Sequence, residues 1–428
     1  MANPVALAAR AKGPFALLKR TCVIIKRYGL TPARLDQALA RFIQVLKRFD
    51  CGATFPVTAI AVERHPALWG KYQAQGIEFA VHGYQHKDYT RLPLQKQLEH
   101  LAYARDILSK NGIHHEGFRC PYLRWSSDTL TAIRQQGFAY DSSQALAWDV
   151  VDGQGTSAYR RALAFYGAQA AIVYPALPRL ENGLLRIPYS IPDDEALVDR
   201  LQLTSTAEIG EIWLTILRRS YELGELFTLG LHPERIARCE APLITTLTEA
   251  RALSPPVWIA RLNEIAAWWR GRTAATVEVT EVGGDTLRLT VAGPPGTTIL
   301  GRSVDIVEPT TPWAGDYRQV VTASCTIRSA VRPFVGISPA CPSALSLFLR
   351  QQGYIVEISD DGRAYSIYLD RTDFTPEDER PLLAHIEKGN GPLVRLGRWP
   401  NGARSALAIT GDIDALTVWD YILRLFGH

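Results

Sequence analysis

Two histidines stand four residues apart in this sequence, His82 and His86, directly after an apolar stretch at residues 77–81. Side chains four positions apart share one face of a helical turn, so both imidazoles can reach one divalent ion. Such a pair on its own is more often structural than metal-binding. Its position after a predicted strand favours a metal site, because the catalytic groups of α/β barrels collect at the carboxyl ends of the strands.

Two further polar residues also follow apolar stretches. Arg119 ends a predicted strand at 117–119, where a guanidinium can hold a carboxylate through two hydrogen bonds, although a surface salt bridge is the simpler interpretation. His232 follows the apolar residues 229–231, and an imidazole with a pKa near neutrality is a candidate general acid. Both positions suit a catalytic centre at one end of a barrel.

Two aspartates, Asp412 and Asp414, follow an apolar stretch at 406–409. Carboxylates two residues apart suit a divided task, in which one binds a metal and the other activates water. In isolation this pattern is weak and is most often a solvated turn. Its position after a predicted strand is what it shares with the other three elements.

Together, these four elements resemble the active site of the polysaccharide deacetylase family, carbohydrate esterase family 4. The resemblance covers residues 29–270 and 398–428. It implies a distorted (β/α) barrel. It also implies a metal-dependent hydrolase of non-peptide carbon–nitrogen bonds, which removes an acetyl group from an N-acetylated sugar or polysaccharide.

By this resemblance, Asp414, His82 and His86 bind the metal, and Asp412 is the base that activates water. The ligand set favours Zn²⁺, while Co²⁺, Mn²⁺ and Ni²⁺ stay open. We therefore expect the two histidines and Asp414 to converge on one ion despite their separation in the sequence.

The resemblance also assigns roles to the remaining motif residues. Arg119 orients the catalytic base, and His232 is the general acid. Asp141 is expected to support the site, although it matches the family's fourth motif only loosely. Tyr122 and Trp125 follow the arginine motif and are expected to bind the sugar.

The order of the motifs departs from the family pattern, in which the acidic motif comes first. Here the segment 17–28 contains no aspartate, and the acidic pair lies near the C-terminal end. A circular permutation explains this order if the strand at 406–409 fills the first barrel position from the other end of the chain. The alternative is that this strand completes the barrel of a neighbouring subunit in a homo-oligomer.

Helical and strand patterns alternate from about residue 30 to residue 270, which is typical of a βα architecture. The predicted strands lie at 53–57, 77–81, 117–119 and 139–141, and the predicted helices at 66–75, 93–110 and 127–136.

After residue 270, short alternating runs separated by glycine-rich turns indicate an antiparallel β module. The predicted fold class is therefore α/β, a distorted barrel with an inserted β module and a small α/β segment. The predicted division is the main part of the deacetylase barrel at 1–272, the β module at 273–329, the α/β segment at 330–397, and a C-terminal strand and helix at 398–428 that complete the barrel.

Composition narrows the class of protein. The 428 residues include 47 Lys and Arg and 43 Asp and Glu, a formal net charge of +4 that does not indicate a nucleic-acid partner. Hydrophobic residues make up 47% of the chain, yet no apolar run reaches the roughly 18 residues of a membrane span. No signal-peptide core is evident, so we expect a cytoplasmic location.

Two other functions stay open at this point. One is an amidase acting on a small nitrogen compound such as allantoin. The other is a carbohydrate-binding protein without turnover, with the β module as its recognition surface, although the full set of catalytic side chains argues against it. The sequence leaves the acceptor sugar, its chain length and the oligomeric state undetermined.

Overall fold

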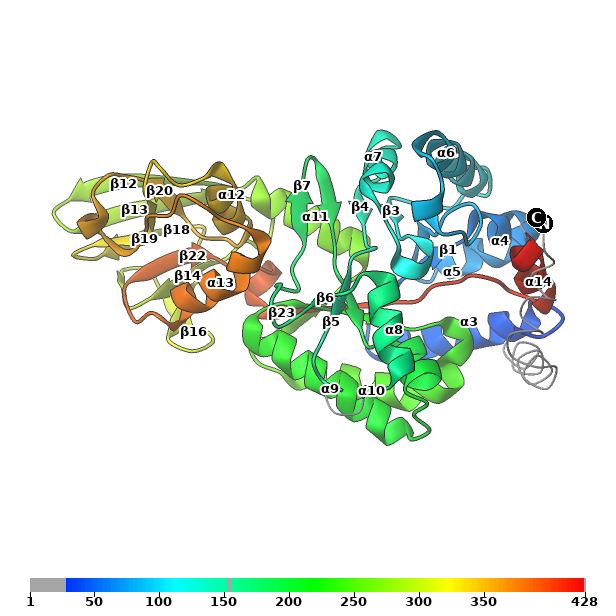
Figure 1. Cartoon of the computed structure of the whole chain (residues 1–428). Helices are drawn as coiled ribbons and strands as arrows, with labels where there is room; N and C mark the ends of the chain where they lie inside the picture. The colour runs from blue at the N-terminus through cyan, green and yellow to red at the C-terminus, as the bar shows by residue number, and fades with distance from the viewer. Residues whose placement is uncertain (1–27, 152–154, 427–428) are drawn as a thin grey trace.

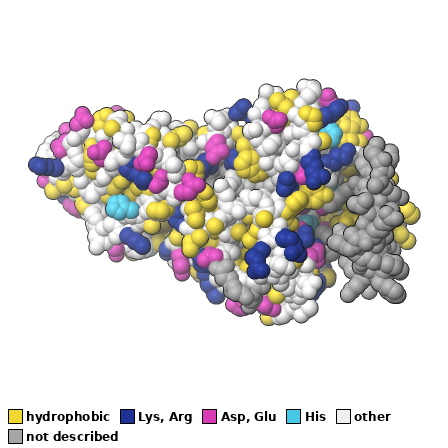
Figure 2. Space-filling view, in the orientation of Figure 1, with side chains coloured by type: hydrophobic (Ala, Val, Ile, Leu, Met, Phe, Trp, Pro, Cys, Tyr) yellow, Lys and Arg dark blue, Asp and Glu magenta, His cyan; other side chains and the backbone are white. Residues whose placement is uncertain are grey.

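The computed structural model describes residues 28–151 and 155–426, which form two lobes side by side (Figure 1). The larger lobe is formed by the described residues up to the end of α11 (Leu262–Thr273) and again from β23 (Ser405–Thr410) to residue 426, and the smaller lobe by the residues between them. On the face drawn in Figure 2, acidic and basic side chains both occur across the two lobes. No helix of the described residues is long and apolar enough to cross a bilayer.

A largely parallel sheet forms the centre of the larger lobe and confirms the predicted α/β fold. Only β7 runs antiparallel to its neighbour, and β11 (Val257–Ile259) pairs with β23 outside the main order. The strand order is β10 (Leu226–Gly230), β23, β1 (Ala53–Val57), β2 (Ile77–Val81), β3 (Gly117–Phe118), β4 (Tyr140–Asp141), β8 (Leu184–Arg186) and β7 (Arg179–Glu181).

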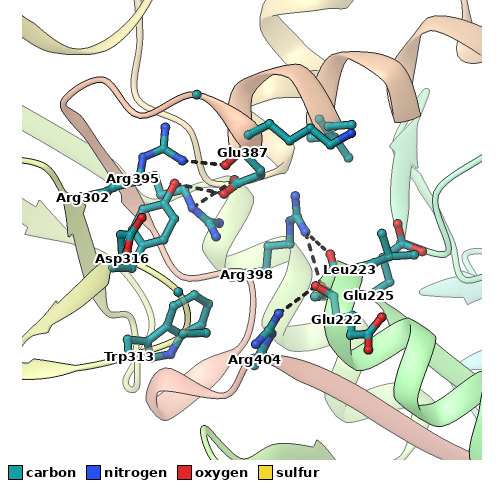
Figure 3. Close-up of a pocket in the computed structure, with 18 of the residues that line it drawn as sticks. Glu222, Leu223, Glu225, Arg302, Trp313, Asp316, Glu387, Arg395, Arg398 and Arg404 are labelled. Carbon is teal, nitrogen blue, oxygen red and sulfur yellow. Dashed lines mark hydrogen bonds and ion pairs between the residues drawn. The ribbon is translucent and has the colours of Figure 1, made fainter.

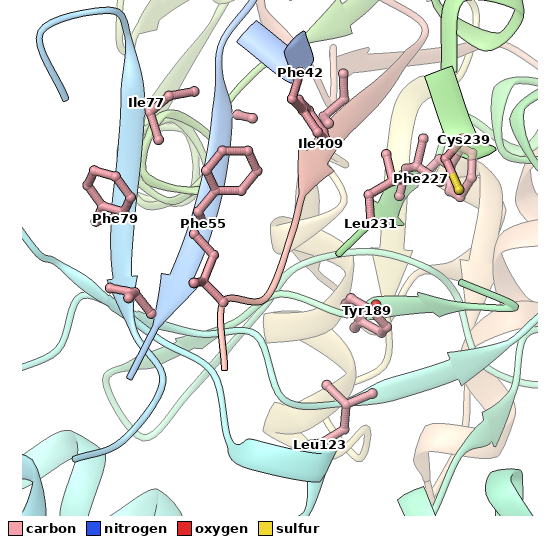
Figure 4. Packing of buried hydrophobic residues seen from close by; sticks show 14 of the residues in the cluster. Phe42, Phe55, Ile77, Phe79, Leu123, Tyr189, Phe227, Leu231, Cys239 and Ile409 are labelled. Carbon is pink, nitrogen blue, oxygen red and sulfur yellow. The ribbon is translucent and has the colours of Figure 1, made fainter. Parts of the chain in front are cut away.

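β23 lies in the middle of this sheet, between β10 and β1 of the same chain. It pairs with β10 over its last five residues, from Ala406 to Thr410, and Thr410 also pairs with Thr54 of β1. All six of its residues are buried, as are all five of β1 and of β2. Strands covered on both faces need continuous apolar sequences, and these strands are largely apolar. Figure 4 shows the resulting core, with Phe55 and Ile409 on neighbouring strands.

Helices of the larger lobe surround the sheet. The predicted helix at 66–75 is in fact a short 3₁₀ turn, Pro66–Leu68, and the four-residue α5, while α4 was not predicted. The predicted helices at 93–110 and 127–136 are confirmed. In chain order the helices are α3 (Ala33–Arg48), α4 (Ala59–Arg64), α5 (Gly70–Gln73), α6 (Leu94–Lys110), α7 (Ser127–Gln135), α8 (Ser157–Tyr166), α9 (Thr206–Leu223), α10 (Ile236–Ala252), α11 and α14 (Val418–Phe426).

A second, three-stranded parallel sheet distorts the barrel. It consists of β6 (Gln169–Ala170), β5 (Ala145–Ala147) and β9 (Tyr189–Ile191), and β5 and β9 follow closely on β4 and β8. β9 approaches β10 from the far side, where the Thr228 backbone N–H donates to the Ser190 hydroxyl at 3.3 Å. Regular strand pairing therefore gives way to side-chain contacts where the barrel closes.

The smaller lobe contains two antiparallel four-stranded sheets and one parallel three-stranded sheet. One strand of the predicted α/β segment, β22, pairs with β14 of the predicted β module, so these two segments share a sheet. The helices of this lobe are α12 (Ser343–Gln351) and α13 (Glu379–Lys388). Its sheets are β12 (Thr276–Gly283), β13 (Thr286–Ala292), β18 (Ser324–Arg328) and β15 (Asp305–Ile306); β16 (Thr310–Pro312), β17 (Tyr317–Val320), β14 (Ile299–Arg302) and β22 (Leu393–Leu396); and β20 (Val356–Ile358), β19 (Arg332–Ile337) and β21 (Tyr365–Leu369).

A glycine permits the close approach of β9 and β10. A Cβ atom at Gly230 would overlap the hydroxyl and ring of Tyr189, which is 3% exposed and has no room to retreat. We predict that Gly230→Ala destabilises the fold by about 1–3 kcal/mol, the usual cost of overpacking. Chemical denaturation measures this difference.

The matched control is Gly70→Ala in α5, because a Cβ atom there meets nothing within 4 Å. Its free energy of unfolding should stay the same or rise, since alanine is the better helix former. Equal stability of both variants would contradict the packing argument at Gly230.

Candidate active site

The predicted site residues come from strands that are neighbours in the parallel sheet. His82 follows β2, Arg119 follows β3, His232 follows β10, and the two aspartates follow β23. Parallel neighbours present their carboxyl ends at one edge, so these side chains gather there. The backbone supports the same arrangement, because the Leu231 N–H donates to the Thr410 carbonyl at 2.8 Å where β10 and β23 end.

Two imidazoles and one carboxylate converge at this edge. Asp414 Oδ1 lies 3.5 Å from His82 Nε2, and Asp414 Oδ2 lies 3.4 Å from His86 Nε2. These ligand atoms all fall within 4.8 Å of one another. Two ligands each about 2.1 Å from a tetrahedral ion lie about 3.4 Å apart. Both the donor set and its spacing therefore fit one divalent ion, with His82, His86 and Asp414 as the residues that would hold it.

A backbone hydrogen bond orients the first of these histidines. His82 is 1% exposed, and its Nδ1 lies 2.8 Å from the carbonyl oxygen of Arg119. A carbonyl only accepts, so Nδ1 carries the proton and the lone pair of Nε2 faces Asp414. Ligating histidines are commonly held by such an outer hydrogen bond.

Arg119 holds the second aspartate. Its Nη1 donates to Asp412 Oδ1 at 2.7 Å, and it also donates to Thr410 and to Ser142. The guanidinium is fully buried and lies 4.5 Å from the centre of the Tyr189 ring. Asp412 remains 13% exposed and its Oδ2 lies 3.8 Å from His82 Nε2. A fixed, partly accessible carboxylate beside the His82–His86–Asp414 cluster can accept a proton from water.

His232 is held by Asp194, a residue that sequence reasoning missed. The Asp194 carboxylate accepts from both the Nδ1 and the backbone N–H of His232, at 2.7 and 2.8 Å. Burial alone would raise the pKa of Asp194, but the adjacent imidazole and Arg235 keep it below its ordinary value. The signal in the sequence was the acidic pair Asp193-Asp194 just after a buried strand.

Asp141 supports a different part of the site. Its Oδ2 lies 3.3 Å from Arg186 Nε, and its Oδ1 accepts from the backbone N–H and the hydroxyl of Ser143. The Ser143 hydroxyl in turn accepts from the Cys120 N–H at 2.8 Å. Asp141 therefore positions the loop that follows Arg119, and the carboxylate that orients the predicted general acid is Asp194 instead.

The two predicted sugar-binding aromatic residues differ in position. Tyr122 has a left-handed backbone, with a φ of 61°, and its ring lies edge-on to His86 at 4.2 Å between ring centres. Trp125 has the Arg186 guanidinium 3.9 Å from its ring centre and lines a cavity of about 150 Å³. Tyr122 thus lies beside the His82–His86–Asp414 cluster, while one face of Trp125 is already covered.

Asp193 precedes Asp194, which holds His232, and it also contacts Tyr189, which packs against Arg119. It accepts from the Tyr189 hydroxyl and from the Ala196 N–H, each at 2.8 Å, and Tyr189 lies beneath Arg119. Burial, together with the neighbouring charge of Asp194, raises the pKa of Asp193 to about 7.

Part of the chain is similar to known proteins. Residues 31–140 match the family model of polysaccharide deacetylase, a range that includes His82, His86 and Arg119. This part of the chain is similar to the polysaccharide deacetylase family. The acidic pair and His232 lie outside the matched range, so their place in the site rests on the geometry described above.

A curated relative is the peptidoglycan deacetylase-like protein FGM2 of Gibberella zeae, 29% identical over 127 residues. The match covers 29% of this chain and 37% of the relative.

Two solved structures with a similar fold each align with 54% of this chain. A probable polysaccharide deacetylase from Pseudomonas aeruginosa is 23% identical with a TM-score of 0.44 over 73% of its own chain. The allantoinase Puue is 22% identical, also with a TM-score of 0.44, over 72% of its own chain.

The raised pKa of Asp193 makes the fold sensitive to pH. In the folded chain this carboxyl keeps its proton up to about pH 7, whereas in the unfolded chain it loses it near pH 4. The folded state therefore binds more protons between these values, and stability falls as the pH rises through that window. We predict a smaller fall between pH 5 and pH 8 for Asp193→Asn than for the wild type.

Thermal unfolding at both pH values measures this difference. Asp316→Asn, at an exposed aspartate in the smaller lobe, should keep the wild-type pH dependence. Parallel pH profiles for wild type and Asp193→Asn would show that Asp193 is ionised in the folded chain.

Proposed function

We propose that this chain is a metal-dependent deacetylase that removes an acetyl group from an N-acetylated sugar or oligosaccharide. The observation that carries the proposal is the convergence of His82, His86 and Asp414 beside the Asp412–Arg119 pair. The match of residues 31–140 to the polysaccharide deacetylase family model supports the same reaction class.

Amide hydrolysis needs an activated water, stabilisation of negative charge on oxygen and a proton for the departing nitrogen. A divalent ion bound by the His82–His86–Asp414 cluster would polarise the acetyl carbonyl and lower the pKa of a bound water. Zinc suits this ligand set best, and Co²⁺, Mn²⁺ and Ni²⁺ accept the same donors.

Asp412 is the base in this proposal. Arg119 fixes its Oδ1 at 2.7 Å, so the free oxygen, Oδ2, faces the metal-binding cluster and takes the proton of the attacking water. Because Arg119 makes four donations to three different residues, its guanidinium keeps one orientation through the reaction.

His232 is the proton donor. Asp194 binds its Nδ1, which leaves Nε2 as the atom that gives a proton to the departing amine. The backbone N–H of Tyr122, on the loop beside His86, is proposed to donate to the oxyanion, and Trp125 to border the sugar on its uncovered face.

The order of the elements supports a circular permutation of the family's barrel. β23 carries the acidic pair and lies next to β1 in the sheet, although the two strands are far apart in the sequence. We propose that β23 takes the place of a strand that other members have before β1. Its pairing within the same chain favours permutation over exchange between subunits.

The two aspartates should separate by role. Asp414→Ala should lose the metal, because it removes one of three ligands. Asp412→Asn should keep the metal and lose roughly 10²–10⁴-fold in rate, because an amide cannot take the proton from water. Metal content by elemental analysis and acetate release from N-acetylated chito-oligosaccharides measure the two effects.

Chelation of the wild-type metal should abolish acetate release, and added Zn²⁺ should restore it. Near-normal turnover of Asp412→Asn would remove the base from the mechanism. Ring opening of allantoin to allantoate without acetate release from sugars would show an amidase of small nitrogen compounds instead.

His232→Ala should distinguish two kinds of substrate. An amine leaves only when protonated, whereas the leaving group of an activated acetyl ester departs unaided. The variant should therefore lose roughly 10²–10⁴-fold on the amide and far less on the ester.

Parallel rate measurements on an N-acetylated sugar and on 4-nitrophenyl acetate check this difference at equal metal content. Equal losses on both substrates would assign His232 a positioning role.

A further inference from the structure

A second cavity lies far from the candidate active site. Its volume is about 390 Å³, and it lies between the end of α9 and the smaller lobe (Figure 3). Glu225, directly before β10, and Arg404, directly before β23, both line it. These parallel strands carry His232 and the acidic pair at their other ends, so the cavity and the active site are separated by the length of a strand, roughly 17–20 Å.

Positive charge dominates the walls of this cavity. The four acidic residues that line it are outnumbered by six basic ones. Three of the arginines are nearly inaccessible, with exposed fractions of 4% for Arg302, 5% for Arg395 and 6% for Arg398. The acids are Glu222, Glu225, Asp316 and Glu387, and the basic residues are Arg302, Arg380, Lys388, Arg395, Arg398 and Arg404.

The pKa of a neighbouring arginine, Arg272, is affected by these positive charges. Arg272 is 2% exposed, and its burial and the charges of Arg398 and Arg395 lower its pKa to about 9. A buried cation is costly unless an anion compensates it. Among the lining residues, Glu225 pairs with Arg380 and Glu387 with Arg395, and a formal excess of two positive charges remains on the cavity walls.

Helix capping explains the positions of some of these arginines. Arg302 donates to the carbonyls of Ile386 and Glu387 at the end of α13, and Arg398 donates to that of Leu223 at the end of α9. Cations suit these positions, because the last carbonyls of a helix lack partners within it. Arg404 similarly donates to the Glu222 carbonyl.

Capping does not explain Arg395. This side chain lies 5.0 Å from the centre of the Tyr317 ring and 5.9 Å from that of Trp313. Its Nε forms an ion pair with Glu387 at 3.4 Å, and its Nη1 has no hydrogen-bond partner among the described residues. Figure 3 shows the Arg395 side chain in the middle of the basic cluster.

We propose that this cavity binds a small organic anion, a phosphate or carboxylate group on a body the size of a sugar. Arginine side chains bind both groups through paired hydrogen bonds. The Trp313 ring, fixed by its Nε1 donation to the Gly402 carbonyl at 2.7 Å, offers a surface for the body of the ligand. A volume of about 390 Å³ lies within the usual range for such sites. This site is independent of the proposed deacetylase reaction.

Isothermal titration of the full chain with four probes tests the proposal. Glucose 6-phosphate or glucuronate should bind more tightly than inorganic phosphate, and glucose should not bind. The tighter of the two sugar anions identifies the charged group. Absence of binding by all three anions at millimolar concentration, or equal binding of glucose, would overturn the proposal.

Three variants locate the site. Arg395→Gln should weaken binding about tenfold, because it removes a charged donor. Arg404→Gln, at a half-buried arginine of the wall, should weaken it by a smaller factor and serves if Arg395→Gln does not fold. Asp316→Asn should tighten binding about twofold, because an exposed negative charge in the wall is removed.

The matched control is Arg318→Gln, at an exposed arginine of β17 that does not line the cavity. Its affinity should equal that of the wild type. Unchanged affinity in Arg404→Gln together with weaker binding in Asp316→Asn would place the anion elsewhere and overturn the proposal.

Discussion

The burial of β23 between β10 and β1 is the constraint on which the active-site arrangement depends. Each of its residues is covered by neighbouring strands and helices, and Gly411, which follows it, has no room for a side chain against Leu231 and Phe55. The Thr58 hydroxyl bonds the Asp414 carbonyl across 356 positions of sequence. Only a strand held this firmly on both sides can deliver two carboxylates to histidines that lie near the other end of the chain.

Arg119 is the second element that joins distant segments. It contacts Thr410 at the end of β23, Ser142 after β4 and the ring of Tyr189 on β9. Such a cation is stable only with a matched carboxylate, and removing one partner of a buried pair costs about 3–5 kcal/mol. Asp412 supplies that charge, so the same interaction stabilises the barrel's end and fixes the proposed base.

Local sequence patterns predicted the parallel strands, because buried strands such as 53–57 and 77–81 are largely apolar. They did not predict Asp194, whose role depends on β9 approaching β10 through a bend that no short pattern encodes. The helix expected at 66–75 is split into a 3₁₀ turn that ends at Leu68 and a short helix that begins at Gly70, a residue type that disfavours helix interiors. Local patterns also did not predict that the β module and the α/β segment share a sheet, because the pairing of β14 with β22 joins residues almost a hundred positions apart.

The inserted lobe follows from the same topology. If β23 must enter the sheet from the end opposite the active site, the chain has to return to the amino ends of β10 and β23 before it does so. The segment 398–404, which makes that return, carries Arg398 and Arg404, and both donate to the last carbonyls of α9. The basic cavity therefore arises where the returning chain is fastened to the barrel. Arg398 and Arg404, which hold this junction together, would also contact an anion bound in the cavity.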